Sequence, residues 1–288
     1  MFLAHRTAVK VLSIADSTVV RSLELSSTSK RSRITGFALS RTEPSCLYFS
    51  TAQGLVYYWD WKKGTKLGRW DLKSPILGLA VGVQDGPDRP VDIVFALDAI
   101  QESGTRISAH KLVGGAEASK TESKTILQVE KQISGFKLGL DGQVLIVSSG
   151  PLLIVGYSLQ GPKTPFRDSK YEWRELRTPD RITCMDVRQS SNVPRANGTK
   201  SKPKASIFTE ASIDVVVGNE KGVVFAHQNI LNKLMILEQR GAAALEGSLV
   251  PRKLHWHREE VHSVRWSRDG TLSISLHSIN GLLLIKNR

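Results

Sequence analysis

The stretch Ile34-Thr35-Gly36-Phe37 sets a pattern that the chain repeats: a branched apolar residue, any residue, a small residue and a second apolar residue. The four later copies are Ile76-Leu77-Gly78-Leu79, Ile133-Ser134-Gly135-Phe136, Ile182-Thr183-Cys184-Met185 and Val261-His262-Ser263-Val264. Successive copies start 42, 57, 49 and 79 residues apart. A four-stranded propeller blade takes about 40 to 45 residues, and insertions lengthen it. The repeat therefore predicts an all-β propeller in which each copy opens the inner strand of a blade.

Alternating apolar residues between the copies predict the remaining strands. The clearest blade has strands at 34–39, 46–50, 54–59 and 66–72. Residues 2–25 read as the later strands of a blade, with Val9, Val11 and Ser13-Ile14 alternating in one strand and Val19 to Leu25 forming the outer one. The last blade begins at Val261. We expect one incomplete propeller over residues 1–288, with about four whole blades and a partial blade at each end.

The small residue in each copy has a steric explanation. Inner strands converge on the propeller axis, where neighbouring blades crowd, and Gly, Ser or Cys lets two backbones approach each other. Cys184 fills this position in its copy, so we expect a buried structural thiol and no nucleophile.

Composition excludes several classes of protein. The chain has 288 residues and no apolar run near the roughly 18 that a membrane span needs. Its first residues do not resemble a secretory signal. Two cysteines, Cys46 and Cys184, do not indicate a disulfide framework. The formal charge of +13 favours encounters with polyanions such as nucleic acid.

Residues 188–206 form a basic insertion that we expect to be a flexible loop. Its cations stand among Ser, Asn, Pro and Gly, and the stretch from Arg188 to Lys204 has no acidic residue. One interpretation is sequence-independent contact with RNA phosphates, and the other is a solvated insertion without a partner. The candidate RNA-contact residues are Arg188, Arg195, Lys200, Lys202 and Lys204.

Two short segments resemble WD-repeat propellers. Trp59-Asp60 matches the dipeptide that ends the third strand of a repeat, and Trp256-His257 stands where the family has Gly-His. The segment from Val261 to Ser267-Arg268-Asp269-Gly270 matches the strand and turn that follow. The resemblance implies structural roles for Trp59, Asp60, His257, Asp269 and Gly270.

A narrower resemblance rests on two segments between residues 213 and 270. Lys253-Leu254-His255-Trp256-His257, and Asp214 to Gly222 leading into His227-Gln228-Asn229-Ile230-Leu231-Asn232, are similar to the fungal family of WD-repeat-containing protein seventy-five, also called U-three small-nucleolar-RNA-associated protein seventeen. The resemblance implies a non-enzymatic, nucleolar scaffold of the small-subunit processome in the nucleus. It would act in pre-ribosomal RNA processing and 18S maturation, linked to RNA polymerase I transcription. The partners implied are other processome proteins, U-three small nucleolar RNA and pre-ribosomal RNA.

Members of that family are longer, with a second propeller and a C-terminal tail. We therefore interpret the chain as a truncated form. A WD-repeat adaptor of another class, such as a ubiquitin-ligase substrate receptor or a chromatin reader, remains the alternative.

Other chemistry finds little support in the sequence. His255, His257 and His262 lack a nearby set of Cys or carboxylates at ligand spacing, so we predict no metal site. The chain has no phosphate-binding loop and no nucleophile elbow. We expect no catalytic residue, cofactor or small-molecule substrate, and no membrane partner.

Overall fold

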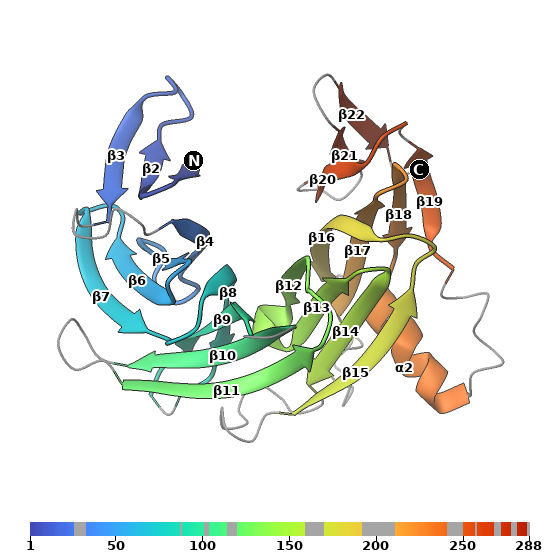
Figure 1. Cartoon of the computed structure of the whole chain (residues 1–288), viewed down its shortest axis with the longest axis horizontal. Helices are drawn as coiled ribbons and strands as arrows, with labels where there is room; N and C mark the ends of the chain where they lie inside the picture. The colour runs from blue at the N-terminus through green and yellow to red at the C-terminus, as the bar shows by residue number, and fades with distance from the viewer. Residues whose placement is uncertain are drawn as a thin grey trace, which may run out of the picture. The chain divides into compact units, whose positions relative to one another are not determined.

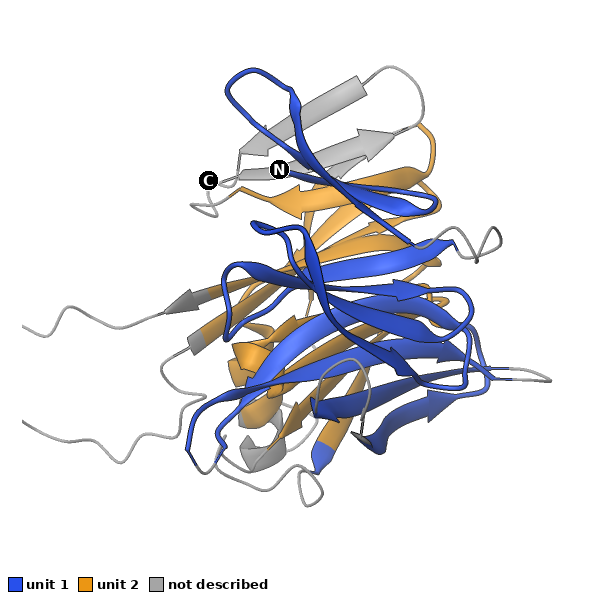
Figure 2. Ribbon diagram, turned by 90° about the vertical axis from the view of Figure 1, so that its left-hand side faces the viewer, with its two compact units in different colours: residues 1–132, 162–171 blue, residues 133–161, 172–288 orange. Residues whose placement is uncertain are grey.

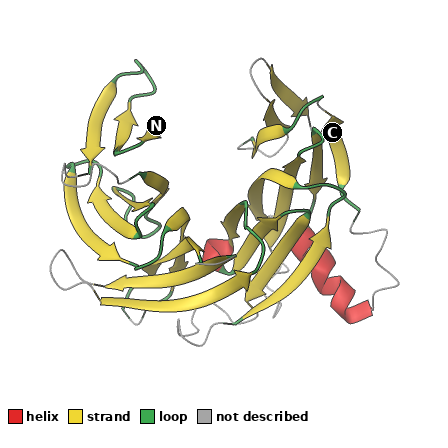
Figure 3. Cartoon of the chain, in the orientation of Figure 1, coloured by secondary structure: helices red, strands yellow, loops and turns green. Residues whose placement is uncertain are grey.

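The computed structural model describes residues 1–25, 33–86, 88–100, 104–113, 120–158, 170–191, 211–240, 250–256, 258–267, 272–277 and 281–286. In this part of the chain the strands form four four-stranded and two three-stranded antiparallel sheets. Figures 1 and 3 show how the strands are arranged. These sheets confirm the expected four whole blades with a partial blade at each end of the sequence. The chain divides into two compact units, residues 1–132 with 162–171 and residues 133–161 with 172–288 (Figure 2).

The first unit holds three sheets, each built from consecutive strands. They are β1 (Phe2–His5), β2 (Ala8–Leu12) and β3 (Val19–Glu24); β4 (Ile34–Leu39), β5 (Cys46–Thr51), β6 (Leu55–Asp60) and β7 (Thr65–Asp71); and β8 (Ile76–Gln84), β9 (Val91–Ala99), β10 (Thr105–Val113) and β11 (Lys120–Val129). Each strand pairs with its neighbour in sequence, which is the meander expected of a propeller blade.

The second unit holds the other three sheets, a 3₁₀ turn and one described α-helix. The elements are β12 (Gly135–Gly139), η1 (Leu140–Gly142), β13 (Val144–Ser149), β14 (Leu152–Ser158) and β15 (Tyr171–Arg177); β16 (Ile182–Ser191), β17 (Ala211–Asn219), β18 (Val223–His227), α2 (Ile230–Arg240) and β19 (Arg252–Trp256); and β20 (Val261–Trp266), β21 (Leu272–His277) and β22 (Gly281–Lys286).

In two of the four-stranded sheets, the second strand is buried on both faces. Every residue of β5 and of β13 is buried, because within each unit a strand inside one sheet is covered by the neighbouring sheets. Trp70 and Tyr48 of one sheet share a core with Ile76 and Val94 of the next. The aromatic residues of the second blade are thus core residues, and no sheet could keep this apolar surface from water alone.

The steric explanation of the small residue holds at Gly36. A Cβ atom there would lie 2.8 Å from the backbone nitrogen of Leu79 on β8, closer than real Cβ contacts. At Gly135 the nearest atoms would be 3.7 and 3.9 Å away, which is ordinary contact. Close backbone approach therefore requires glycine in the second blade and not in the fourth.

Three local expectations were wrong. Ser13 and Ile14 lie beyond the end of β2, and Ile14 is 82% exposed in the turn that leads to β3. The helix α2 was not predicted, although Ile230, Leu231 and Leu234 have helical spacing and pack against the core that includes β17. The basic insertion starts later than expected, because β16 continues through Arg188 to Ser191 in register with β17.

Replacing Gly36 with alanine should lower the free energy of unfolding by about 1–3 kcal/mol, because the new methyl group meets backbone that cannot move aside freely. Chemical denaturation measures the change. Gly135→Ala is the matched control and should cost less, since its Cβ meets only ordinary contacts. Equal losses in the two variants would contradict the close approach of β4 and β8.

Two buried histidines make stability depend on pH. Burial lowers the pKa of His110 to about 4, and the charge of Arg106 adds to this lowering. Burial also lowers the pKa of His227 to about 4, and the charge of Lys233 adds to it. Between pH 6.5 and 4 the unfolded chain binds protons that the folded chain does not, so stability falls as the pH falls. At pH 5 each histidine should cost about 2 kcal/mol relative to pH 7. Urea unfolding should show a smaller pH dependence in His227→Gln, and an unchanged dependence would contradict the burial of His227.

Candidate functional site

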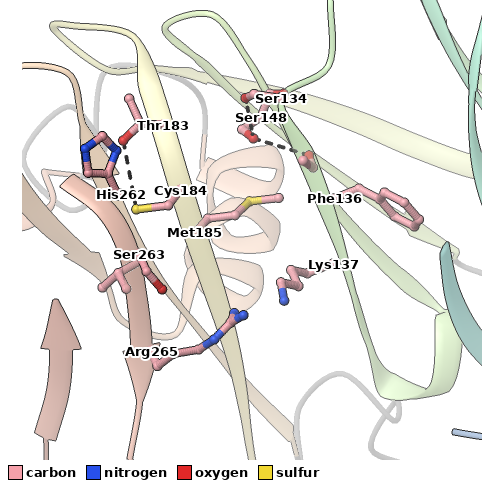
Figure 4. A pocket seen from close by; sticks show the side chains of 12 residues that line it. Ser134, Phe136, Lys137, Ser148, Thr183, Cys184, Met185, His262, Ser263 and Arg265 are labelled. Atoms are coloured by element: carbon pink, nitrogen blue, oxygen red, sulfur yellow. Dashed lines mark hydrogen bonds between the residues drawn. The ribbon is translucent and has the colours of Figure 1, made fainter. Parts of the chain in front are cut away.

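A pocket of about 200 Å³ lies in the second unit, where the inner strands β12, β16 and β20 run beside one another (Figure 4). β16 and β20 each open with a copy of the repeated pattern, and β12 begins within its copy, at Gly135, so the repeat itself builds the pocket. Its lining residues are Ser134, Gly135, Phe136, Lys137, Ser148, Thr183, Cys184, Met185, His262, Ser263, Val264 and Arg265.

Hydroxyl groups hold one end of this lining in place, at the top of Figure 4. The hydroxyls of Ser134 and Ser148 are 2.9 Å apart, and Ser134 also donates to the carbonyl of Ile182 at 3.4 Å. Across β16, Thr183 and the Cys184 thiol both donate to the carbonyl oxygen of Val261, the thiol at 3.2 Å. These bonds tie β12 to β16 and β16 to β20. Burial raises the pKa of the Cys184 thiol to about 11, which agrees with the structural role expected for it.

Asp186 links the same three strands by charge. Its Oδ1 atom lies 3.8 Å from Lys137 Nζ on β12 and 3.3 Å from an Arg265 guanidinium nitrogen on β20. Its Oδ2 atom accepts the backbone N–H of Trp266 at 3.0 Å. Figure 4 shows Lys137 and Arg265 extending toward one another across β16. Burial lowers the pKa of the Lys137 amino group, and the nearby guanidinium of Arg265 adds to this, while Asp186 opposes it.

Sequence reasoning missed Lys137, Asp186 and Arg265, yet the repeat contains the signal. Each stands two residues after the small residue of its copy: Gly135, Cys184 and Ser263. The first two copies have Ala38 and Ala80 at this position. Aligning the copies on the small residue would have shown a charged residue at the same position in three consecutive copies.

Arg188 has a structural role in the fold. Its guanidinium forms an ion pair with Asp214, whose side chain is 5% exposed, and lies 5.1 Å from the ring centre of Trp266. Asp214 also accepts the backbone N–H of Asn229 at 2.8 Å, at the start of α2. Because β16 extends further than the sequence indicated, this arginine belongs to the sheet and not to a loop. Arg195, Lys200, Lys202 and Lys204 lie outside the described residues.

Of the positions expected from the WD-repeat resemblance, the structure describes Trp59 and Asp60 in the second blade. Asp60 is the last residue of β6, and its Oδ1 atom accepts the backbone N–H groups of Lys62 and Lys63, both at 3.0 Å. It therefore caps the turn into β7. Trp59 packs against Phe49, with ring centres 6.2 Å apart. His257, Asp269 and Gly270 lie outside the described residues.

The described residues contain no group of three or more His, Cys, Asp or Glu side chains that could hold a metal ion. No helix among them is long and apolar enough to cross a membrane.

Arg188→Ala should lower the free energy of unfolding by about 1–3 kcal/mol, because it leaves the buried Asp214 carboxylate without its cation. Denaturant unfolding measures the loss. The exposed Arg177 on β15 provides the control, since Arg177→Ala should change stability by less than about 0.5 kcal/mol. A neutral Arg188→Ala would mean that this ion pair does not support the fold.

Comparison with known proteins identifies the fold. No protein-family model matches the chain, and no curated protein matches it in sequence. Among solved structures it is similar to BBS1N, solved in complex with ARL6DN, with a TM-score of 0.60, 11% identity, and coverage of 100% of this chain and 73% of that one. It is also similar to the β-propeller domain of Cps50 (Swd1) from Myceliophteria thermophila, with a TM-score of 0.59, 14% identity, and coverage of 99% and 80%. The chain has the fold of an incomplete WD-repeat β-propeller.

Proposed function

We propose that this protein is a non-enzymatic scaffold of the small-subunit processome that acts in the nucleolus. It takes part in pre-ribosomal RNA processing and 18S maturation, and its work is linked to transcription by RNA polymerase I. Its propeller strands and loops dock other processome proteins, and its basic residues contact pre-ribosomal and U-three small nucleolar RNA. WD-repeat propellers typically serve as binding scaffolds, which supports the non-enzymatic part of the proposal.

One observation carries the proposal: the two halves of a family-like segment contact each other. Asp214 on β17 begins the first half, and Asn229 before α2 belongs to the second. The carboxylate of Asp214 accepts the backbone N–H of Asn229 and also pairs with Arg188. Asp214 and Asn229 of the family-like segment are thus joined in the fold. The proposal rests on the resemblance of this segment to the processome family.

Charge supports the contact with RNA. A net charge of +13 creates a field that attracts polyanions, and Lys and Arg supply most phosphate contacts. Arg188 is engaged within the sheet, so the contact is assigned to Arg195, Lys200, Lys202 and Lys204. Binding through these residues would not depend on RNA sequence and would weaken as salt rises.

A second candidate, an adaptor that recognises a short peptide, is favoured by the pocket between β12, β16 and β20. A receptor of this kind would bind its peptide in a defined pocket and depend less on salt than a scaffold held by phosphate contacts. The salt dependence of binding to RNA and to peptide separates the two functions.

The proposal predicts that the tagged protein enriches U-three small nucleolar RNA and the pre-ribosomal leader at low salt, and much less at moderate salt. Changing Arg195, Lys200, Lys202 and Lys204 together to glutamine should make the plot of log K against log salt concentration less steep by about three for single-stranded leader RNA. Fluorescence anisotropy with labelled leader RNA measures this slope.

The control removes four positive charges elsewhere, through Lys62→Gln, Lys66→Gln, Arg69→Gln and Arg177→Gln. It should leave the slope nearly unchanged. Equal effects of the two variants would show a diffuse field with no contact by the insertion. If neither RNA is enriched at any salt concentration, the processome assignment fails and the adaptor function replaces it.

A further inference from the structure

The pocket between β12, β16 and β20 carries more positive than negative charge. Lys137 and Arg265 both line it, and their side chains are 37% and 57% exposed. Among the described residues, Asp186 is the one carboxylate within 4.0 Å of either cation. The nearby Glu260 pairs instead with Arg181, at 3.9 Å. Two cations therefore share a single carboxylate, that of the partly buried Asp186.

Both cations have donors left for another acceptor. A guanidinium carries five N–H groups and an ammonium three. Arg265 donates to Asp186 Oδ1, and Lys137 reaches the same oxygen at 3.8 Å, which is longer than a good hydrogen bond. The hydroxyl-bearing side chains of Thr183 and Ser263 also line the pocket. The remaining N–H donors of Lys137 and Arg265 suit a group that carries several acceptor oxygens and a negative charge.

The size of the pocket limits what can enter. Pockets that enclose a whole small-molecule ligand have volumes of roughly 300–1,000 Å³. At about 200 Å³, this pocket admits only the end of a larger molecule. Its two aromatic rings, Phe136 and His262, lie on opposite sides of β16 and do not face each other across a space in which a nucleobase could stack (Figure 4). A side chain reaching in from an extended peptide fits these limits better than RNA.

We propose that this pocket binds an oxyanion on a partner peptide, a carboxylate or a phosphate, between Lys137 and Arg265. Asp186 partly neutralises the two cations and so keeps the empty pocket from being strongly positive. The site is separate from the basic insertion, and it does not depend on the proposed role in the processome.

Labelled peptides test the proposal by fluorescence anisotropy on the full chain. The probes are hexaglutamate, a neutral peptide with one phosphoserine, and hexaglutamine as the uncharged control. At least one anionic peptide should bind saturably, and hexaglutamine should not bind. The tighter of the two anionic peptides identifies the source of the oxyanion. If neither binds, or if hexaglutamine binds equally, the proposal is wrong.

Matched variants locate the binding. Arg265→Gln should weaken the bound peptide about tenfold or more, because it removes a charge-assisted hydrogen bond. Arg177→Gln removes the same charge from an exposed position at the end of β15 and should change binding less than about twofold. Equal losses in the two variants would overturn the proposal, because they would show attraction by the general field.

Asp186→Asn separates ligand binding from a purely structural role. The amide keeps an oxygen that can accept the Trp266 N–H, but it no longer neutralises Lys137 and Arg265. Peptide affinity should therefore rise several-fold, a result that misfolding cannot produce. Weaker binding by Asp186→Asn with an unchanged unfolding midpoint would overturn the proposal. The proposal would also be overturned if hexauridylate displaced the peptide and Arg265→Gln abolished hexauridylate binding, because the pocket would then bind RNA.

Discussion

The structure depends on side-chain acceptors of one sheet that bind backbone N–H groups of the neighbouring sheet. In the first unit, Asp92 on β9 accepts the N–H groups of Arg41 and Thr42, at 3.1 and 3.0 Å, in the bend between β4 and β5. In the second unit, Asp186 on β16 accepts the N–H of Trp266 on β20. Gln189 on β16 accepts the N–H of Leu140 at 3.0 Å in the same manner. These bonds satisfy backbone groups near buried surface, where an unpaired N–H would be costly.

The same bonds determine how close the inner strands come to one another. Hydrophobic burial favours contact between sheets but does not fix their register, because it has no direction. A carboxylate that accepts particular N–H groups does fix it, and Gly36 then allows β4 to approach the backbone of β8. In the second unit the result is a small polar pocket whose two cations come from the strands on either side of Asp186. The candidate site is therefore a consequence of sheet-to-sheet packing at one repeated position.

Much of the fold could be predicted because its signals are local. The strand 34–39 was predicted with the bounds that the structure gives, and the last blade was predicted to begin at Val261, where β20 begins, since alternation over a few residues and the turns beside them suffice. Ser13 and Ile14 were misplaced because an apolar residue in a turn continues the alternation without belonging to the strand. The helix α2 was missed because the expected strand order of a blade outweighed the helical spacing of Ile230, Leu231 and Leu234. The partners of Arg188 and Asp186 were missed because they lie 26 to 80 residues away and meet only when sheets pack.

Amide hydrogen exchange at Arg41 and Thr42 tests the central claim most directly. Both residues lie in a bend outside the strands, and the side chain of Arg41 is exposed, so without Asp92 their amides would exchange as fast as those of an open loop. If carboxylates join neighbouring sheets, both amides exchange as slowly as those of β5. Asp92→Ala then removes their protection and leaves the pairing of β6 with β7 intact. Fast exchange at Arg41 and Thr42 in the unaltered protein would contradict the account.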